Sequence, residues 1–572
     1  MSNDIQQTSK GAMQNIYSRS VLLLMVLIHS SSAQPDGARA GRPFDLQGFI
    51  DGELVAGKRR IVIPPGRYRV SPRKRQHLLL ADLDGVEIIA KGVEMICTET
   101  TRALTIHGCT NTTLVGMTID YDPLPYTQGK IVKISPDGLV HDIELFKGYA
   151  ATGTITATKY EIFRADTRTL RAGSYYGCKL TVLSPGKLRV VKPKHYRNQH
   201  PEQVGDIIAT TSVHAPGGSI PHAIFLAKST NVRLEGITLY ASNCFGFLEV
   251  ECSGTVYRRC IIDRRPAATD VKDRADPRIR SLNADAYHSK HAEVGPSYIE
   301  CQARFQGDDC VAINGDYHMV MATEGSELRV LAKRSMNIAK GDPVELVSYE
   351  GMRLPDAVVV SVKPDGEIND AEVAFLRKQR MNANLKSNHH GALTKAFRVV
   401  IDRPVSLPMG SVICSANRVG NGFKVIDCEF GFNRSRGILV KASKGEIRGN
   451  LLDHVWMHAI SLSPEWWWLE AGSGSDIVIR DNVIKGGHGR AINVSAKGGS
   501  GKTPQAGAHR NITIVGNRIE DCPTPQILIT STAGLVITGN TISGVKGDPL
   551  TPEQAIEQKS CTDTTVKDNV IE

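Results

Sequence analysis

Short runs of alternating hydrophobic and polar residues recur along this chain, and most of them turn at a glycine or an asparagine. Residues 86–92 show the pattern first, and residues 112–119 and 232–239 repeat it. Further runs of the same kind lie at 255–262, 445–450, 477–484, 512–519 and 535–542. Alternation with a period of two residues predicts β-strands with one buried face.

The later runs share an asparagine at their corner, namely Asn450, Asn482, Asn517 and Asn540. Glycine and asparagine tolerate left-handed backbone angles, so they suit a sharp corner between two strands. A strand-and-corner unit that cannot bury its own face predicts a solenoid. Because the units are strands without helical periodicity, we predict an all-β protein with a right-handed parallel β-helix. An antiparallel β-sandwich is the alternative, but hairpin turns are scarce.

Two stretches interrupt this rhythm, at roughly 128–215 and 321–402. Both contain strand-like runs without the glycine-asparagine corners, and each predicts a small inserted β-barrel-like subdomain. Insertions in a solenoid leave it on one face, which is often the binding face. The predicted organisation is a signal peptide at 1–33, β-helix turns at 34–127, an insertion at 128–215, central turns with the candidate catalytic residues at 216–320, a second insertion at 321–402 and C-terminal turns at 403–572.

The segment Val21–Ile28 is the one apolar run that could enter a membrane, and it is too short for a spanning helix, which needs ~20 residues. Arg19 precedes it, and the small residues Ser31–Ala33 offer a cleavage site before Gln34. This order is typical of a secretory signal, so we predict a secreted or periplasmic protein without stable membrane insertion. An apolar first helix is the alternative.

The formal net charge of +10 suggests attraction to acidic polymers, such as uronate or sulfated glycans, although scattered charge could also serve only solubility. No lysine or arginine block indicates nucleic-acid binding. Export would permit disulfides among the twelve cysteines, yet many of these lie in strand-like runs, where a free thiol behaves as a small hydrophobe. No cysteine or histidine cluster has zinc spacing, so we predict neither a structural metal nor a cofactor.

Candidate chemistry lies in two short segments, Asn283-Ala284-Asp285 and Gly307-Asp308-Asp309. Asp285 and Asp308 are 23 positions apart, about one turn of the predicted coil, so we expect them on adjacent turns ~4.8 Å apart. Like charges at that distance resist joint ionisation, so one carboxyl should keep its proton near neutral pH. An acid beside a base is what hydrolysis of a glycosidic bond requires. Calcium binding or solvated surface acids are the alternatives.

These segments resemble the Asn-x-Asp and Gly-Asp-Asp-Cys motifs of polygalacturonases, glycoside hydrolase family 28. The longer strings Ala284–His288, Gly307–Asp309 and Ile313–Gly315 look more like glycoside hydrolase family 110, whose members are exo-acting α-1,3-galactosidases on a β-helix with β-barrel insertions. Other stretches that look like that family are Asp120–Gly129, Arg436-Gly437 and Trp468–Gly472. Both families invert the anomeric centre, which by similarity makes Asp308 the acid and gives Asp285 and Asp309 the attacking water.

The chain also departs from both families. The Gly-His-Gly and Arg-Ile-Lys motifs of polygalacturonases are missing. The histidine that often follows the asparagine of the galactosidase motif is absent too, since Asn314-Gly315 runs straight to Asp316. These differences bear on which sugar is bound more than on the type of reaction.

Five further residues are predicted to bind substrate. His288 follows Asp285 closely and could bind a sugar hydroxyl or tune a carboxyl, with a structural role as the alternative. One tryptophan of 466–468, most simply Trp468, could offer a stacking face, and Glu470 a hydroxyl acceptor, although tryptophan is often only packed. Arg436 and Lys441 should point to opposite faces of one strand, and Arg436 is preferred. The predicted set is therefore Asn283, His288, Arg436, Trp468 and Glu470.

The resemblance implies a secreted, metal-independent, inverting exo-glycoside hydrolase that releases terminal α-linked galactose from glycans or galactan oligosaccharides. One alternative is a polygalacturonase-like hydrolase or a polysaccharide lyase acting on an acidic polysaccharide. The other is a non-catalytic, glycan-binding β-helix. The expected partner in each case is an oligosaccharide or polysaccharide, with acidic and sulfated glycans among the candidates. The exact sugar and the oligomeric state stay open at this point.

Overall fold

A computed structural model describes residues 41–149, 159–171, 173–198, 201–211, 221–270, 274, 276–386 and 393–572. The predicted signal peptide at 1–33 lies outside these residues. Among the described residues, no helix is both long enough and apolar enough to cross a membrane.

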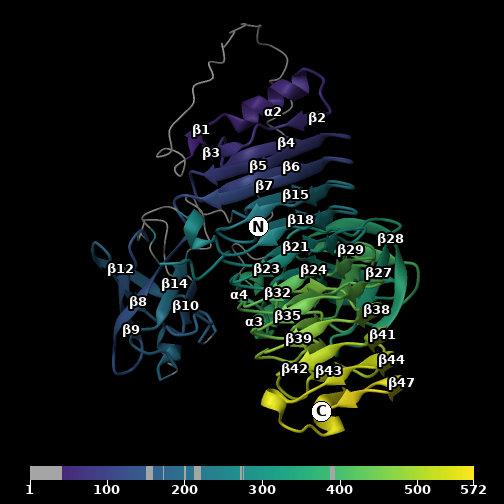
Figure 1. Ribbon diagram of the computed structural model, residues 1–572. Helices are drawn as coiled ribbons and strands as arrows, with labels where there is room; N and C mark the ends of the chain where they lie inside the picture. Colours follow the sequence, from purple (N-terminus) through teal and green to yellow (C-terminus); the bar gives the residue numbers. More distant parts are fainter. Residues whose placement is uncertain are drawn as a thin grey trace.

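Most of the chain winds into a parallel β-helix, whose strands stack in successive turns from the N-terminal to the C-terminal end (Figure 1). Its larger sheet contains β1 (Arg42–Pro43), β2 (Arg60–Val62), β3 (Gly66–Val70), β5 (Glu87–Cys97), β7 (Thr113–Tyr121), β16 (Arg233–Glu235), β17 (Thr238–Leu239), β19 (Val256–Arg258), β20 (Ile261–Ile262), β22 (Ser297–Ile299), β23 (Gln302–Arg304), β31 (Lys424–Ile426), β32 (Glu429–Gly431), β34 (Glu446–Arg448), β35 (Leu451–Asp453), β38 (Ser475–Arg480), β39 (Val483–Lys485), β41 (His509–Val515), β42 (Arg518–Glu520), β44 (Thr532–Thr538), β45 (Thr541–Ile542), β47 (Thr562–Lys567) and β48 (Val570–Ile571). The predicted fold class is confirmed.

A second parallel sheet carries the candidate catalytic segments. It contains β4 (Gln76–Ala81), β6 (Arg102–His107), β15 (Ile224–Ala227), β18 (Phe247–Val250), β21 (Tyr287–Lys290), β24 (Val311–Asp316), β33 (Ile438–Val440), β36 (Ile460–Leu462), β40 (Ile492–Val494), β43 (Ile527–Thr530) and β46 (Ile556–Lys559). The short strand β37 (Glu470–Ala471) adds to β24 in the antiparallel sense. Short helices lie outside the sheets at α2 (Leu46–Val55), α3 (Asp370–Lys378), α4 (Ala383–Lys386) and α5 (Pro552–Ala555).

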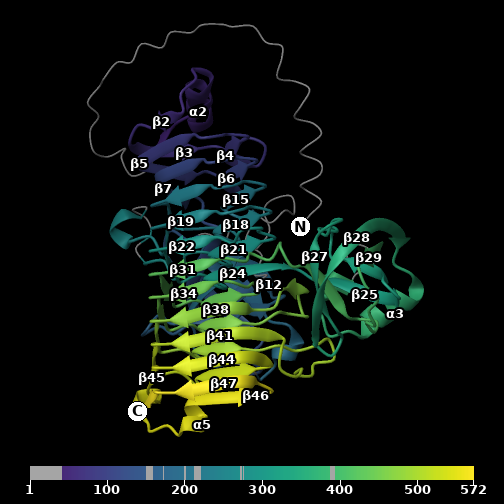
Figure 2. The ribbon, with the colours of Figure 1, turned by 90° about the vertical axis from the view of Figure 1, so that its right-hand side faces the viewer.

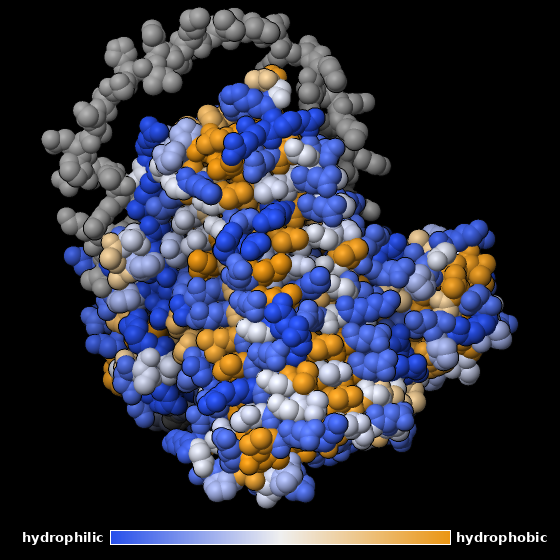
Figure 3. Space-filling view, turned by 45° about the vertical axis from the view of Figure 1, so that its right-hand side comes forward, coloured by the Kyte–Doolittle hydropathy of each residue, from blue (hydrophilic) through white to orange (hydrophobic). Residues whose placement is uncertain are grey.

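The core forms because equivalent apolar residues stack from turn to turn. Leu234 pairs with Leu114 on one side and Tyr257 on the other, and Tyr257 pairs with Tyr298. All four are buried, whereas their neighbours along each short strand face outward. Parallel pairing in register thus brings one buried side chain per strand over the next, which explains the alternation in the sequence. The face of the molecule in Figure 3 mixes polar and hydrophobic residues.

The corner asparagines form a ladder inside the β-helix. The side-chain oxygen of Asn517 accepts from the backbone N–H of Asn482 at 3.0 Å, and its amide donates to the Ile479 carbonyl at 3.0 Å. The left-handed angles expected of these asparagines occur one residue earlier, for example at Gly516 with a φ of 67°. The asparagines therefore serve to bond successive turns, while the preceding residue makes the corner.

Both predicted interruptions are inserted β-structures. The first is an antiparallel sheet of β8 (Tyr126–Ile134), β9 (Val140–Leu145), β10 (Lys159–Phe163), β11 (Tyr175–Tyr176), β12 (Lys179–Ser184), β13 (Lys187–Val191) and β14 (Ile207–Thr211), seen beside the β-helix in Figure 1. The second is a closed barrel of β25 (His318–Glu324), β26 (Glu327–Ala332), β27 (Pro343–Val347), β28 (Arg353–Glu367), β29 (Lys395–Ile401) and β30 (Val412–Ser415), seen to the right in Figure 2. Its closing strand β30 follows residue 402, where this insertion was expected to end.

Candidate active site

The three candidate aspartates lie together where two neighbouring strands begin. Asp285 precedes β21, and Asp308 and Asp309 precede β24. One carboxylate oxygen of each lies within 4.8 Å of the other two. The parallel register joins Tyr287 to Val311, an offset of 24 residues, so Asp285 stacks on Asp309. The expectation that Asp285 stacks on Asp308 was therefore wrong by one residue, because the turn between the strands holds one residue more than the assumed repeat.

Each carboxylate has a different ionic partner. Asp308 pairs with Arg434 and lies 4.0 Å from the Lys159 ammonium. Asp309 pairs with the Arg436 guanidinium at 3.1 Å and accepts from the Arg436 backbone N–H at 2.7 Å. The Asp308 side chain is 28% exposed, whereas that of Asp309 is only 5% exposed.

These surroundings separate the pKa values of the three carboxyls. Burial raises the pKa of Asp309 to about 7, an effect that Arg436 opposes and the charges of Asp285 and Asp308 reinforce. Burial also raises the pKa of Asp285, against the hydrogen bond from His288. For Asp308, Arg434 and Lys159 outweigh the effect of burial and hold the pKa below its ordinary value. The free site thus keeps one proton near pH 7, as expected of like charges in contact, and favours Asp309 as its holder.

This distribution differs from the roles that the family resemblance implies, because an acid must carry a proton and Asp308 is held ionised. The difference has a plain cause, since both cations nearest Asp308 stabilise its charge. The assignment of Asp308 as the acid stays a prediction.

His288 is fixed on three sides. Its Nδ1 is 2.7 Å from the Asp285 carboxylate, and its Nε2 is 3.2 Å from the Asn314 amide. The ring stacks on Phe245 with a centroid distance of 4.8 Å and an angle of 7°. This geometry suits the predicted tuning of a carboxyl, because the imidazole holds Asp285 in one orientation.

Asn283 does not face a binding space. Its side chain is completely buried, and its amide donates to the Pro125 carbonyl at 3.0 Å and to the Thr211 hydroxyl. Pro125 directly precedes the first insertion, and Thr211 is the last residue of its strand β14. Asn283 therefore ties the Asp285 turn to that insertion, because both hydrogens of its buried amide are donated there.

Arg436, Lys441, Glu465 and Glu470 form a chain of ion pairs that extends from Asp309. Arg436 and Lys441 both reach Glu465, at 3.4 and 3.6 Å, and Lys441 also pairs with Glu470. The two cations thus meet at one carboxylate, although a regular strand would point them to opposite faces; the Arg436 side chain is 18% exposed, whereas that of Lys441 is completely buried. The strand between them, β33, spans only Ile438–Val440, so alternation does not hold across the pair.

The tryptophans divide between core and surface. Trp466 packs against Tyr317 and Tyr349, whereas Trp467 and Trp468 are 47% and 41% exposed. They lie in the short loop between Glu465 and Glu470, whose carboxylates belong to the ion-pair chain. Trp467 and Trp468 are thus both open to solvent beside this chain of ion pairs, and a ligand contact by Trp468 stays a prediction.

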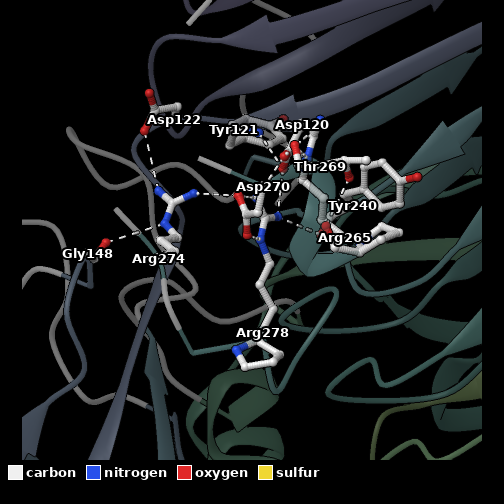
Figure 4. Close-up of polar contacts among 12 residues, drawn as sticks. Asp120, Tyr121, Asp122, Gly148, Tyr240, Arg265, Thr269, Asp270, Arg274 and Arg278 are labelled. Carbon is white, nitrogen blue, oxygen red and sulfur yellow. Dashed lines mark hydrogen bonds and ion pairs between the residues drawn. The ribbon is translucent and has the colours of Figure 1, made fainter. Parts of the chain in front are cut away.

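A buried ionic network holds the segment that leads into Asp285 (Figure 4). Arg278 is enclosed between Asp120 and Asp270, with N–O distances of 2.7–2.9 Å. Beyond this network, the Tyr126 hydroxyl donates to the Arg280 carbonyl at 2.7 Å, and the Gln128 amide to the Pro277 carbonyl at 2.9 Å. The string Asp120–Gly129, noted only for its resemblance, therefore anchors the segment that leads into Asp285.

No protein-family model matches the chain. The α-1,3-galactosidase B of Bacteroides thetaiotaomicron is 22% identical over 608 aligned residues, covering 96% of this chain and 91% of that protein. The α-1,3-galactosidase A of Streptomyces avermitilis is 26% identical over 344 residues, covering 56% of this chain and 49% of that protein. The chain resembles the α-1,3-galactosidases. This likeness supports a glycoside hydrolase and agrees with the motifs of family 110.

Among solved structures, the endo-xylogalacturonan hydrolase of Aspergillus tubingensis has a TM-score of 0.41 at 9% identity, with 91% of this chain and 95% of that chain covered. A mannuronan C-5 epimerase A-module of Azotobacter vinelandii has a TM-score of 0.40 at 11% identity, with 93% and 97% covered.

Sequence reasoning missed three residues of this galactosidase-like site, namely Lys159, Arg434 and Glu465. Lys159 comes from β10 of the first insertion, and its ammonium donates to the Asn283 carbonyl at 2.8 Å and to the Gly307 carbonyl. No local signal marks it, because the contact joins parts of the chain that are distant in sequence. Arg434 and Glu465 lie beside recognised motifs, and the same turn-to-turn stacking that joins β24 to β33 could have indicated Arg434.

Proposed function

We propose that the protein is a secreted, inverting exo-glycoside hydrolase that releases terminal α-linked galactose from glycans or galactan oligosaccharides. The observation that carries the proposal is the carboxylate cluster, in which Asp309 has a pKa of about 7 while Asp308 is held ionised. A proton donor within 4.8 Å of an ionised carboxylate provides the general acid and the general base that hydrolysis of a glycosidic bond requires.

A neutral sugar suits the charges of the site better than an acidic one. Arg434 pairs with Asp308, Arg436 with Asp309, and Lys441 with Glu470. Recognition of a uronate or sulfate requires a cation that can face the ligand's charge. These three cations already have carboxylate partners, which supports galactose over the acidic alternative. The partly exposed carboxylates of Asp308, Glu465 and Glu470 remain suited to sugar hydroxyls.

The two insertions support action at a chain end, because both reach the site. Lys159 of the first insertion contacts the aspartate turns, and Lys333 of the barrel donates to the Leu469 carbonyl at 3.0 Å. An insertion on each side of the aspartates favours a binding site that is closed at one end, which admits a chain end, over an open groove that would accept the middle of a chain. The expected product is free galactose, released stepwise from the non-reducing end.

Inversion rests on the family resemblance. Carboxylates of inverting enzymes are commonly ~6.5–9.5 Å apart, and the oxygens of this cluster are closer. The deciding experiment is hydrolysis of an α-1,3-linked galactose disaccharide followed by NMR. β-Galactose as the first-formed product supports inversion, whereas α-galactose as the first product contradicts it.

The same substrate panel separates the alternatives. Turnover of polygalacturonate in place of galactosides would favour a polygalacturonase-like enzyme, and an unsaturated, ultraviolet-absorbing product lost on chelation would favour a lyase. Binding without turnover would favour a non-catalytic β-helix. Export is tested by sequencing the N-terminus of the protein recovered outside the cytoplasm, where we expect it to begin at Gln34.

A further inference from the structure

One face of the first insertion is directed at the aspartate turns. On β10, Lys159 reaches the Asn283 carbonyl and Glu161 pairs with Arg280, so both side chains point toward the β-helix. Tyr160 between them is buried in the insertion's own core. Successive side chains of a strand alternate between faces, so the sheet has one inner face and one face toward the active site.

The neighbouring strand β11 presents Tyr176 on that same face. β11 pairs antiparallel with β10, with Lys159 opposite Tyr176 and Tyr160 opposite Tyr175. Residues directly opposite each other share a face and lie ~4.5–5.5 Å apart at Cβ. Tyr175 accordingly packs in the insertion's core, and the Ser174 hydroxyl donates to the Glu161 carboxylate on the other face. Tyr176 therefore stands beside the lysine that approaches Asp308 to 4.0 Å.

Tyr176 is partly open to solvent and has charged neighbours. The residue is 45% exposed, while Lys159 beside it is buried. Partial burial raises the pKa of its phenol, the charge of Arg434 lowers it and the charge of Asp308 raises it. Asp308 is also the most exposed of the three carboxylates. The open side of the cluster is thus the side on which Tyr176 stands.

We propose that Tyr176 forms a wall of the subsite that binds the leaving sugar, with its ring against the apolar face of a pyranose. The inference rests on the proposed glycosidase function. The ion-pair chain from Arg436 to Glu470 lies on the Asp309 side and offers many hydrogen-bonding groups, which suits the terminal sugar. The leaving sugar then lies on the Asp308 side, where an aromatic ring provides contact area without requiring one particular linkage.

The test compares two substrates in the full-length protein. An α-1,3-galactose disaccharide places a sugar in the subsite, and α-galactosyl fluoride places none. Tyr176→Ala should lower the ratio of kcat/KM for the disaccharide to that for the fluoride about five- to tenfold. Tyr176→Trp should largely restore the ratio, because the contact depends on the ring. Val182→Ala, at an exposed position on β12 of the same insertion, should leave the ratio at its wild-type value.

An equal loss on both substrates, or no loss on either, would overturn the proposal. A loss in Tyr176→Phe as large as in Tyr176→Ala would overturn stacking in favour of the hydroxyl. Calorimetric binding of the disaccharide and of free galactose to the Asp309→Asn variant gives a second measurement that needs no turnover. An added Tyr176→Ala change should weaken only disaccharide binding. If the wild type hydrolyses neither substrate, the proposed function fails, while this binding difference still decides the subsite.

Discussion

Replacing Arg436 by glutamine should raise the pH at which activity is lost. Arg436 lies 3.1 Å from the Asp309 carboxylate and lowers its pKa, which burial raises to about 7. If the reaction needs the proton on Asp309, wild-type kcat/KM falls as pH rises through about 7. Without the guanidinium, the ionised form of Asp309 loses its closest cation, so the proton is held to higher pH.

The size of the shift follows from the distance. Two unit charges 3.1 Å apart interact by about 5 kcal/mol at an effective dielectric constant of ~20, equivalent to ~4 pKa units. This is an upper bound, because Arg436 also faces Glu465 at 3.4 Å and water would replace the guanidinium. We therefore expect the alkaline limb to move up by at least ~1 unit.

The assay is kcat/KM on an α-galactoside between pH 4 and 9. Arg448→Gln is the matched control, because Arg448 is an equally charged residue on the other sheet, paired with Glu446 at 3.4 Å. Its profile should overlie that of the wild type. Arg436 is also expected to contact substrate, so the overall rate will fall, and the position of the limb is the diagnostic quantity. A limb that stays in place or moves down would show that Asp309 is not the protonated group, and would return the acid role to Asp308.

Three other measurements follow from the structure. Lys159→Met should lower kcat about a hundredfold while the far-ultraviolet circular dichroism stays native, because the Lys159 ammonium bonds to both aspartate turns. The control Lys130→Met, at an exposed site, should leave kcat unchanged. Full activity in Lys159→Met would refute the idea that this ammonium holds the two turns together. Asn517→Ala should reduce the free energy of unfolding by about 2–4 kcal/mol, since it removes the side-chain hydrogen bonds to the Asn482 N–H and the Ile479 carbonyl. Chemical denaturation measures the change, with Thr565→Ala at an exposed strand position as the control that should leave it near zero. Thermal unfolding should occur at a lower temperature at pH 5 than at pH 7, because four histidines bind protons more readily in the unfolded chain than in the folded protein. Full or partial burial lowers the folded-state pKa of each from 6.5 to about 4, namely in His77, His318, His458 and His509. That stabilisation is complete above pH 6.5 and is lost as pH falls toward 4; His509→Gln should reduce the difference, and a midpoint that rises on acidification would contradict the assignment.

The architecture could be predicted from the sequence because its information is local. Each short strand carries its own alternation, and the asparagine at each corner marks the repeat. The register between strands of successive turns could not be predicted as well from the sequence. The offset between paired strands varies from turn to turn, for example 22 residues from Lys424 to Glu446 and 35 from Ile477 to Ile512, so the repeat could not distinguish 23 from the observed 24. That one residue decides whether Asp285 stacks on Asp308 or Asp309. The hydrogen-bonding role of Asn450 and its equivalents could not be predicted either, because each asparagine bonds to the asparagine of the next turn, and this contact forms only once the turns are stacked.

The candidate site could be predicted only as far as its three carboxylates. Parallel stacking brings Asp285, Asp308 and Asp309 together, yet stacking alone would leave three similar acids in one environment. Their differences come from outside those two turns. Arg434 and Arg436 come from the following turn, and Lys159 comes from an insertion that begins far earlier in the chain. Because these cations act on the pKa values of the carboxyls, the first insertion takes part in tuning the aspartate cluster through Lys159. A β-helix with the same aspartates but without Lys159 would lose one of the two cations that most strongly hold the pKa of Asp308 below its ordinary value.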